Sequence, residues 1–339
     1  MAEIRHKTIP TMRAVMLTAK GGPDVLRVVE VPMPVPGPGE VRVKVLATGV
    51  GATDVTMRRG SYIFAPRIPF IPGYESIGIV DAVGKDVASL KEGDRVCALL
   101  VYGGYAEYVV RGAEHWIKVP SGLSDLAAVS LVLNYVTAFQ MIRRKARLQP
   151  GQSALVNAAN GGVGQALLDL LRALGISAIG AAAQAHHEIV SSYGAIPIEG
   201  RFAPLDDGVH RVRPQGVDAA FDAVGGRATG ECIASTRRGG TTVWYGFVGA
   251  RKTSELVHSY ASLFIGSRLK RRRGTFYGIT MWYRKDPLPF REDLLELFRL
   301  LQENKIAPRI AQTFPLLDAR KANERLEAGG IEGKIVLVA

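Results

Sequence analysis

Cysteine is nearly absent from this chain, which has only Cys97 and Cys232 among 339 residues. Two cysteines cannot form a disulfide framework, and each lies in or beside an apolar segment, so we expect two buried thiols without a catalytic role. Apolar runs long enough to span a bilayer are also missing, and the polar stretch from Met1 to Pro10 lacks the apolar core of a signal peptide. These absences favour a soluble protein of the cytoplasm.

Acidic residues are the minority of the charged ones, because 31 Asp and Glu stand against 43 Lys and Arg and leave a formal net charge of +12. This charge suits an anionic partner. The densest basic run is 268–273, which reads RLKRRR. No helix-turn-helix pattern and no RNA-binding motif with interleaved aromatics accompanies the run, so a nucleic-acid partner is not favoured. A solvated turn, a contact for a phosphate-bearing ligand and an anionic membrane patch stay open.

Glycine, by contrast, is abundant, with 38 residues, and the most informative stretch is the glycine turn 157–165. It follows the apolar run 153–156 and opens the amphipathic segment 165–174, so the local order is strand, turn and helix. Such a turn can hold a pyrophosphate on backbone N–H groups and the positive end of the helix dipole. The usual pattern is G-x-G-x-x-G, and Ala159 replaces its first glycine, yet the context favours a dinucleotide site over a plain turn.

The glycine turn has an expected role for each glycine. Gly161 should permit the tight turn, Gly162 should let the backbone approach the phosphates, and Gly164 should let the helix pack closely on the strand. The residues predicted to contact the cofactor here are Ala159, Asn160, Gly161, Gly162, Val163 and Gly164.

The chain divides into two kinds of sequence, and its length suits two domains. The first part has short, β-branched, partly alternating segments and reads as an all-β unit; the expected strands are 13–18, 26–31, 41–46, 76–83, 95–100 and 106–110. From residue 153 onward, strands and helices alternate with short turns, which predicts a doubly wound parallel sheet; the expected strands are 153–157, 177–180, 196–198, 217–222 and 241–246.

The end of the chain is expected to return to the first part. The alternating pattern ends by about residue 279, and the helix 290–302 and strand 334–338 follow it. The predicted domains are therefore a discontinuous β domain, 1–130 with 280–339, and a nucleotide-binding domain, 131–279.

Several motifs then resemble one family over nearly the whole chain, in matching order and spacing. They are GVGATD at 49–54, IPGYE at 71–75, KEGDRV at 91–96, GGYAEY at 103–108, NYVTA at 134–138 and the glycine turn. The chain resembles the medium-chain dehydrogenase/reductase superfamily, specifically its zinc-independent quinone oxidoreductase (zeta-crystallin-like) group. The resemblance implies an α/β protein with a GroES-like β domain and a Rossmann domain, and we expect a homodimer.

Two positions depart from the zinc alcohol dehydrogenases of this superfamily. Gly51 stands where those enzymes have a metal-binding cysteine, and Tyr74 stands where they have a metal-binding histidine. Neither side chain is a usual zinc ligand, so we expect no metal site. Without a metal to activate an alcohol, a quinone or an α,β-unsaturated carbonyl is the favoured hydride acceptor, because hydrogen bonds alone can stabilise its reduced oxygen. Asp54 and Glu75 also match family positions, where structural hydrogen bonding is expected of them.

The resemblance also implies site residues. Tyr62 matches a tyrosine near the nicotinamide and substrate, where a phenol could hydrogen-bond or protonate the acceptor, or simply line the site. Thr53, Asn134 and Thr137 match segments that line the nicotinamide and substrate, although Asn134 could instead cap a helix. Tyr245 is a further candidate for this lining, because it lies at the end of a predicted parallel strand and ligands bind at the carboxyl ends of such strands. Its alternative role is packing.

The predicted cofactor is NADPH. An NAD site usually has Asp or Glu about 20 residues after the glycine turn, but here 180–184 reads GAAAQ, and Glu188 lies inside the next helix. In the resembling reductases a lysine and a tyrosine hold the 2′-phosphate, and the matching positions are His186 and Arg201. Arg201 offers a charged fork to a phosphate, whereas His186 is a weaker partner. The alternative is that both are only exposed polar residues.

Three functions stay open. The favoured one is a zinc-independent, NADPH-dependent reductase of quinones or α,β-unsaturated carbonyls with a small-molecule substrate. The others are an enoyl-thioester reductase and a vesicle- or membrane-associated interaction protein of the same fold, without stable membrane insertion.

Overall fold

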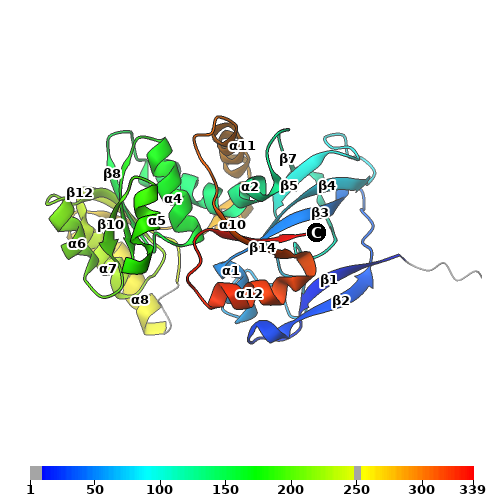
Figure 1. Cartoon of the computed structure of the whole chain (residues 1–339), viewed down its shortest axis with the longest axis horizontal. Coiled ribbons are helices and arrows are strands. Elements are labelled where there is room, and N and C mark those ends of the chain that lie inside the picture. The colour runs from blue at the N-terminus through cyan, green and yellow to red at the C-terminus, as the bar shows by residue number, and fades with distance from the viewer. Residues whose placement is uncertain (1–9, 248–252) are drawn as a thin grey trace, which may run out of the picture. The chain divides into compact units, whose positions relative to one another are not determined.

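The computed structural model describes residues 10–247 and 253–339, which form two compact units. The first unit contains 10–133, 309–330 and 334–339, and the second contains 134–247, 253–308 and 331–333 (Figure 1). The polar start of the chain, considered above for a signal peptide, lies outside the described residues up to position 9.

The first unit is built on a mainly antiparallel seven-stranded sheet. Its strand order is β14-β15-β3-β4-β5-β7, with β6 on β3, and β1 and β2 form a separate antiparallel pair. The strands are β1 (Thr11–Leu17), β2 (Leu26–Pro32), β3 (Glu40–Val50), β4 (Glu75–Val83), β5 (Arg95–Leu99), β6 (Tyr108–Gly112), β7 (Ile117–Lys118), β14 (Ile310–Pro315) and β15 (Lys334–Val338). Alternating burial along β1 and β3 confirms the period-2 pattern seen in the sequence.

The second unit is a six-stranded parallel sheet in the order β10-β9-β8-β11-β12-β13. The strands are β8 (Ser153–Asn157), β9 (Ser177–Ala182), β10 (Ile196–Glu199), β11 (Val217–Asp222), β12 (Thr236–Trp244) and β13 (Arg273–Phe276). The order is that of the Rossmann fold, with its reversal between β8 and β11. Helices connect the strands: α4 (Gly162–Ala173), α5 (His187–Ser192), α6 (Leu205–Val212), α7 (Arg227–Ser235), α8 (Thr253–Ala261) and α9 (Ser267–Leu269). The predicted fold class is confirmed.

The segment 280–308 packs with the second unit, whereas the sequence led us to assign it to the first. It contains most of α10 (Ile279–Lys285) and all of α11 (Leu288–Gln302). Asp293 of α11 binds Arg144 through two hydrogen bonds, Nε to Oδ2 at 2.7 Å and Nη2 to Oδ1 at 2.8 Å, and also accepts one from Gln140 at 2.7 Å. These partners lie 149 and 153 residues away in the chain, so no local pattern indicates them.

One long helix corrects the expectation that no segment could span a bilayer. The continuous helix Asp125–Ala146 is long and apolar enough by length and composition, and 83% of its apolar window is buried inside the protein. It consists of α2 (Asp125–Ser130) and α3 (Val136–Gln140), each followed by a wider π-helical segment, Leu131–Tyr135 and Met141–Ala146. Its burial is that of a core helix. Polar residues such as Asn134 interrupt its sequence, so the helix does not stand out as one continuous apolar run.

The basic run 268–273 forms the turn that leads into β13. Arg272 is tied to the fold, since its Nε donates to the carbonyl oxygen of Thr236 at 2.6 Å, whereas the other basic side chains of the run are exposed. The run precedes a parallel strand and therefore lies at the amino edge of the sheet, while the glycine turn follows β8 at the carboxyl edge. It therefore cannot contact the phosphates of a cofactor bound at the glycine turn.

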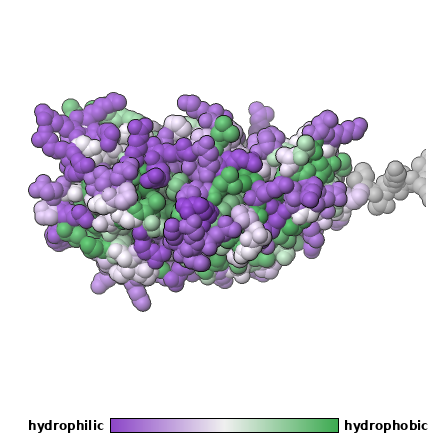
Figure 2. All heavy atoms as spheres, turned by 90° about the horizontal axis from the view of Figure 1, so that it is seen from above, coloured by the Kyte–Doolittle hydropathy of each residue, from purple (hydrophilic) through white to green (hydrophobic). Residues whose placement is uncertain are grey.

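The surface of the molecule seen in Figure 2 is mainly hydrophilic, with smaller hydrophobic areas between the hydrophilic ones.

Candidate active site

The glycine turn joins β8 to α4 beside the reversal of strand order. The first helical bond is donated by the Gln165 N–H to the Gly161 carbonyl at 2.8 Å. The N–H groups of Gly162, Val163 and Gly164 precede this bond, so they have no partner within the helix. Gly161, Gly162 and Val163 are partly exposed. Backbone donors at an exposed helix N-terminus suit an anion, so the turn fits the pyrophosphate of a dinucleotide.

The structure supports close packing as the reason for glycine at 164. A Cβ there would overlap the carbonyl oxygen of Ala158 and lie 2.8 Å from that of Ala159. The role expected of Gly161 is wrong, because its φ of −73° is open to any residue. The left-handed residue of the turn is Ala158, with φ 57°, whose N–H donates to the side-chain oxygen of Asn157 at 2.9 Å.

The Asn134 side chain faces the glycine turn. A Cβ on Gly162 would lie 2.6 Å from Asn134 Nδ2, so this glycine makes room for the amide as well as for a ligand. Asn134 is buried within the π-helical segment of the long helix, so the alternative that it caps a helix is wrong. Thr137, three residues later, is also buried, and its Oγ1 has no hydrogen-bond partner among the described residues. The hydroxyl is therefore available to hydrogen-bond a ligand.

Asp222, at the end of β11, was not predicted. Its buried carboxylate accepts hydrogen bonds from Thr229 Oγ1 at 2.7 Å, from the Val224 N–H at 2.9 Å and from Asn157 Nδ2 at 3.1 Å. Burial raises its pKa, and these hydrogen bonds oppose the rise. The carboxylate thereby joins the ends of β8 and β11 with the start of α7. Its only sequence signal was its place at a strand end.

Tyr245 follows β12 directly and belongs to the same neighbourhood. Its N–H donates to the carbonyl oxygen of Asp222 at 2.9 Å, and the residue is half-buried. Burial and the nearby Asp222 raise the pKa of its phenol, so it stays neutral and can act only as a hydrogen-bonding or packing group.

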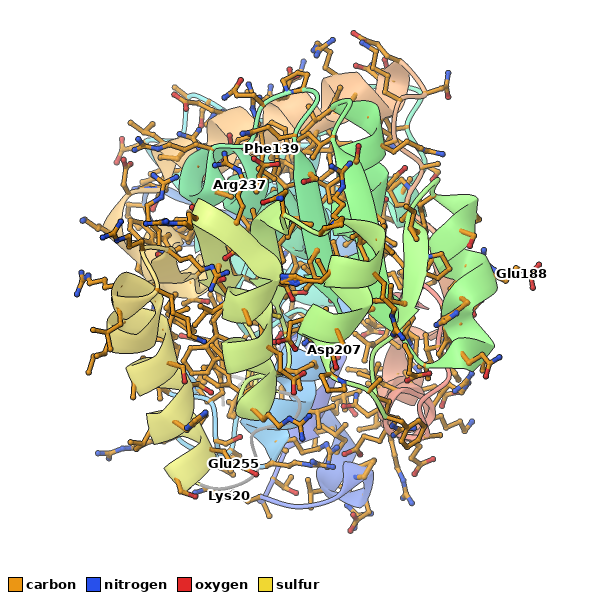
Figure 3. The ribbon with its side chains drawn as sticks, turned by 90° about the vertical axis from the view of Figure 1, so that its left-hand side faces the viewer. Lys20, Phe139, Glu188, Asp207, Arg237 and Glu255 are labelled. Atoms are coloured by element: carbon orange, nitrogen blue, oxygen red, sulfur yellow. The ribbon has the colours of Figure 1, made fainter. Side chains whose placement is uncertain are left out.

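The residues predicted for the 2′-phosphate lie at the ends of β9 and β10. Arg201 is exposed, and His186 Nδ1 lies within hydrogen-bonding distance of Glu332 Oε1, at 3.1 Å. Glu332 is far away in the chain, and no local pattern indicates it. Glu188 is exposed and points away from the protein (Figure 3), so it is not placed to bind a ribose here. The predicted phosphate site therefore has one accessible cation and one carboxylate that the sequence did not reveal.

In the first unit, the side chains of Tyr62 and Tyr74 are in contact. Their hydroxyl oxygens are 2.5 Å apart and the rings pack edge to face. Tyr62 is half-buried and Tyr74 fully buried, so Tyr74 holds the hydroxyl of the more accessible ring. Thr53 is half-buried in the first turn of α1 (Ala52–Arg58), and its carbonyl accepts from Thr56 Oγ1 at 2.8 Å.

Gly51 and Tyr74 occupy the positions of zinc ligands in the zinc alcohol dehydrogenases, and the carboxylates near them, Asp54 and Glu75, each have a partner. Asp54 accepts from the Gly51 N–H at 2.9 Å, and burial raises the pKa of Asp54 to about 6. Glu75 forms a fully buried ion pair with Lys334, and burial raises its pKa against that attraction. Among the described residues no group of three or more His, Cys, Asp or Glu could hold a metal ion. The donor set present therefore does not fit a catalytic zinc.

Comparison with known proteins places this geometry in a family. Residues 37–121 match the alcohol dehydrogenase GroES-like domain, and residues 198–337 match the zinc-binding dehydrogenase family. The human synaptic vesicle membrane protein VAT-1 homolog-like is 30% identical, over 96% of this chain and 80% of its own. The chain belongs to the medium-chain dehydrogenase/reductase superfamily, in its quinone oxidoreductase group.

Other members of this superfamily extend the likeness. The human mitochondrial enoyl-[acyl-carrier-protein] reductase is 32% identical over 86% of this chain and 79% of its own, and a quinone oxidoreductase of Pongo abelii is 28% identical over 96% and 98%. The crystal structure of the human VAT-1 homolog-like protein has a TM-score of 0.85 at 28% identity and covers 97% of this chain and 98% of its own. A mycobacterial structure in complex with NADPH has a TM-score of 0.82 at 28% identity, over 97% and 100%. These likenesses support an oxidoreductase of the medium-chain type.

Both cysteines behave as predicted. Cys97 and Cys232 are free and fully buried, and burial raises the pKa of each thiol. A thiol that is inaccessible and protonated is not a nucleophile.

Proposed function

We propose that this protein is an NADPH-dependent reductase of quinones or α,β-unsaturated carbonyls. Two observations carry the proposal: the second unit has a turn that fits a dinucleotide, and in the first unit Tyr74, at a position that holds a metal ligand in the zinc enzymes, is hydrogen-bonded to Tyr62. NADPH, when bound, supplies a hydride. The quinone oxidoreductase relatives and the mycobacterial NADPH complex support this assignment.

The residues of the second unit would hold the cofactor. The N–H groups of Gly162, Val163 and Gly164 would bind the pyrophosphate. The unpartnered Thr137 hydroxyl and the Asn134 amide would offer hydrogen bonds on the nicotinamide side. Arg201 would meet the 2′-phosphate, with the carboxylate of Glu332 reducing the preference for it.

Tyr62 would donate a hydrogen bond to the oxygen on which the acceptor gathers negative charge. Tyr74 would orient that hydroxyl, since the two oxygens are 2.5 Å apart. Removing one such donor lowers turnover by about 10²–10³-fold where it acts on a developing oxyanion. A conjugated acceptor needs only this help, because it spreads the incoming charge itself.

A panel of quinones, enones and enoyl thioesters assayed with NADPH tests the proposal. Turnover of a quinone or enone, together with little oxidation of simple primary alcohols, is the expected result. Tyr62→Phe should lower turnover and leave NADPH binding nearly intact, whereas Tyr108→Phe, another half-buried tyrosine of the first unit, should change neither. Faster turnover of ethanol than of any conjugated acceptor would reject the proposal, and full turnover by Tyr62→Phe would reject the role of Tyr62.

Reduction of an enoyl thioester is the second candidate. The enoyl-[acyl-carrier-protein] reductase relative at 32% identity favours it, and the net charge of +12 suits a phosphate-bearing carrier. Activity confined to thioester substrates in the same panel would establish it. Binding to anionic vesicles without any NADPH binding would instead favour an interaction protein, as the VAT-1 relatives leave open.

A further inference from the structure

The second unit contains a cavity of about 350 Å³ that is separate from the predicted cofactor residues. The C-terminal half of the long helix, α10 and the start of α11 enclose it. None of the residues predicted for the dinucleotide site lines it. Its walls are aromatic, with Tyr277, Trp282, Tyr283 and Phe290, and two lysines also line it, Lys145 and Lys285.

The two lysines share one aromatic ring. Lys145 Nζ lies 2.9 Å from the centroid of the Trp282 ring, and Lys285 Nζ lies 5.6 Å from the same centroid. Within the part of the chain that the structure describes, neither ammonium group forms an ion pair. Burial and the positive charge of Lys285 lower the pKa of Lys145 to about 8. The ring attracts both cations.

The other charged groups around the cavity already have partners. Arg144 is bound to Asp293 by two hydrogen bonds, and Asp286 accepts from the Leu288 N–H at 3.0 Å near the start of α11. In contrast, Trp282 Nε1 is buried and has no acceptor among the described residues. Among the described residues, the cavity therefore combines two ammonium groups without an ion-pair partner with an indole N–H that lacks an acceptor.

We propose that this cavity binds a small organic carboxylate. The carboxylate would accept hydrogen bonds from Lys145 and Lys285, and its apolar body would lie against Trp282 and Phe290. A negative charge between the lysines would relieve their repulsion. The volume suits a small ligand, and the aromatic walls favour an apolar body over a fully polar anion. An inorganic phosphate is disfavoured, since Arg144, the planar fork that suits phosphate, is engaged with Asp293.

Titration of the NADPH-free protein with hexanoate tests the proposal, followed by calorimetry and by tryptophan emission excited at 295 nm. Saturable binding is expected, with hexanamide and inorganic phosphate at least about tenfold weaker. Lys145→Met and Lys285→Met should each weaken hexanoate binding by about tenfold or more. Lys270→Met, an exposed lysine outside the cavity, should bind hexanoate like the native protein. Lys285 is exposed, so its variant is expected to fold even where Lys145→Met does not.

Three outcomes would overturn the proposal. They are no saturable binding of hexanoate, binding of hexanamide or phosphate as tight as that of hexanoate, and native affinity in Lys285→Met. Trp282→Phe should lose the emission change but retain calorimetric binding, which would show that the signal comes from this cavity. The experiment uses no NADPH and no hydride acceptor, so its result is independent of the proposed reductase activity.

Discussion

Gly164→Ala offers the most direct test of how the glycine turn works. The new Cβ would overlap the carbonyl oxygen of Ala158 and approach that of Ala159 to 2.8 Å. Both neighbours are backbone atoms, which cannot rotate away, so the start of α4 must move. Overpacking of this kind costs about 1–3 kcal/mol. The N–H groups that precede the first helical bond would move with the helix, so dinucleotide binding should weaken as well.

Gly230→Ala is the matched control. Gly230 lies within α7, and a Cβ there meets nothing within 4 Å. Alanine at a helical position is more favourable than glycine by at most about 1 kcal/mol, and this gain is common to both variants. The difference in unfolding free energy between the two variants therefore estimates the steric cost at Gly164. Gly162→Ala should be milder, because its Cβ would meet the end of the Asn134 side chain and no backbone atom.

Thermal unfolding and NADPH titration measure both effects. A change of 1 kcal/mol moves the melting temperature of a unit of this size by about 2–4 °C. We expect Gly164→Ala to melt at least a few degrees below Gly230→Ala and to bind NADPH more weakly, while Gly230→Ala binds like the native protein. Equal melting temperatures and equal NADPH affinities for the two variants would refute the packing argument.

Four further outcomes are expected. Fluorescence titrations should show that NADPH binds more tightly than NADH. Arg201→Glu should erase this preference and Glu332→Gln should enlarge it, each changing the relative affinity by about ten- to hundredfold. Equal affinities of the native protein for the two cofactors would contradict the prediction. Burial in the folded state raises the pKa of Asp54 from 3.8 to about 6, so between these values the folded state binds a proton that the unfolded state has lost. The unfolding free energy should therefore fall by about 2 kcal/mol from pH 4 to pH 6, and urea unfolding should show a smaller fall in Asp54→Asn. Lys334→Met should lower the unfolding free energy by about 3–5 kcal/mol, because it leaves Glu75 buried and unpaired. Adding Glu75→Gln should recover part of this loss of stability. An unchanged unfolding free energy in the single variant would argue against a tight ion pair. Elemental analysis should find no stoichiometric zinc, and activity should withstand chelators.

The sequence determined the features that depend on neighbouring residues. Strand alternation, the glycine turn after β8 and the change from β segments to alternating strands and helices are local patterns, and the structure contains them all. They were sufficient for the two-part fold and for the position of the dinucleotide turn. The family motifs then indicated that Gly51 and Tyr74 replace metal ligands.

Only the tertiary structure decided the partners that are far apart in the chain. Ala158, rather than Gly161, has the left-handed backbone of the turn, and α11 packs with the second unit, where Asp293 binds Arg144. The contact of His186 with Glu332 likewise joins residues 146 positions apart. Periodicity and turn chemistry report on a few neighbouring residues, whereas buried hydrogen bonds and ion pairs depend on which distant segments the fold brings together.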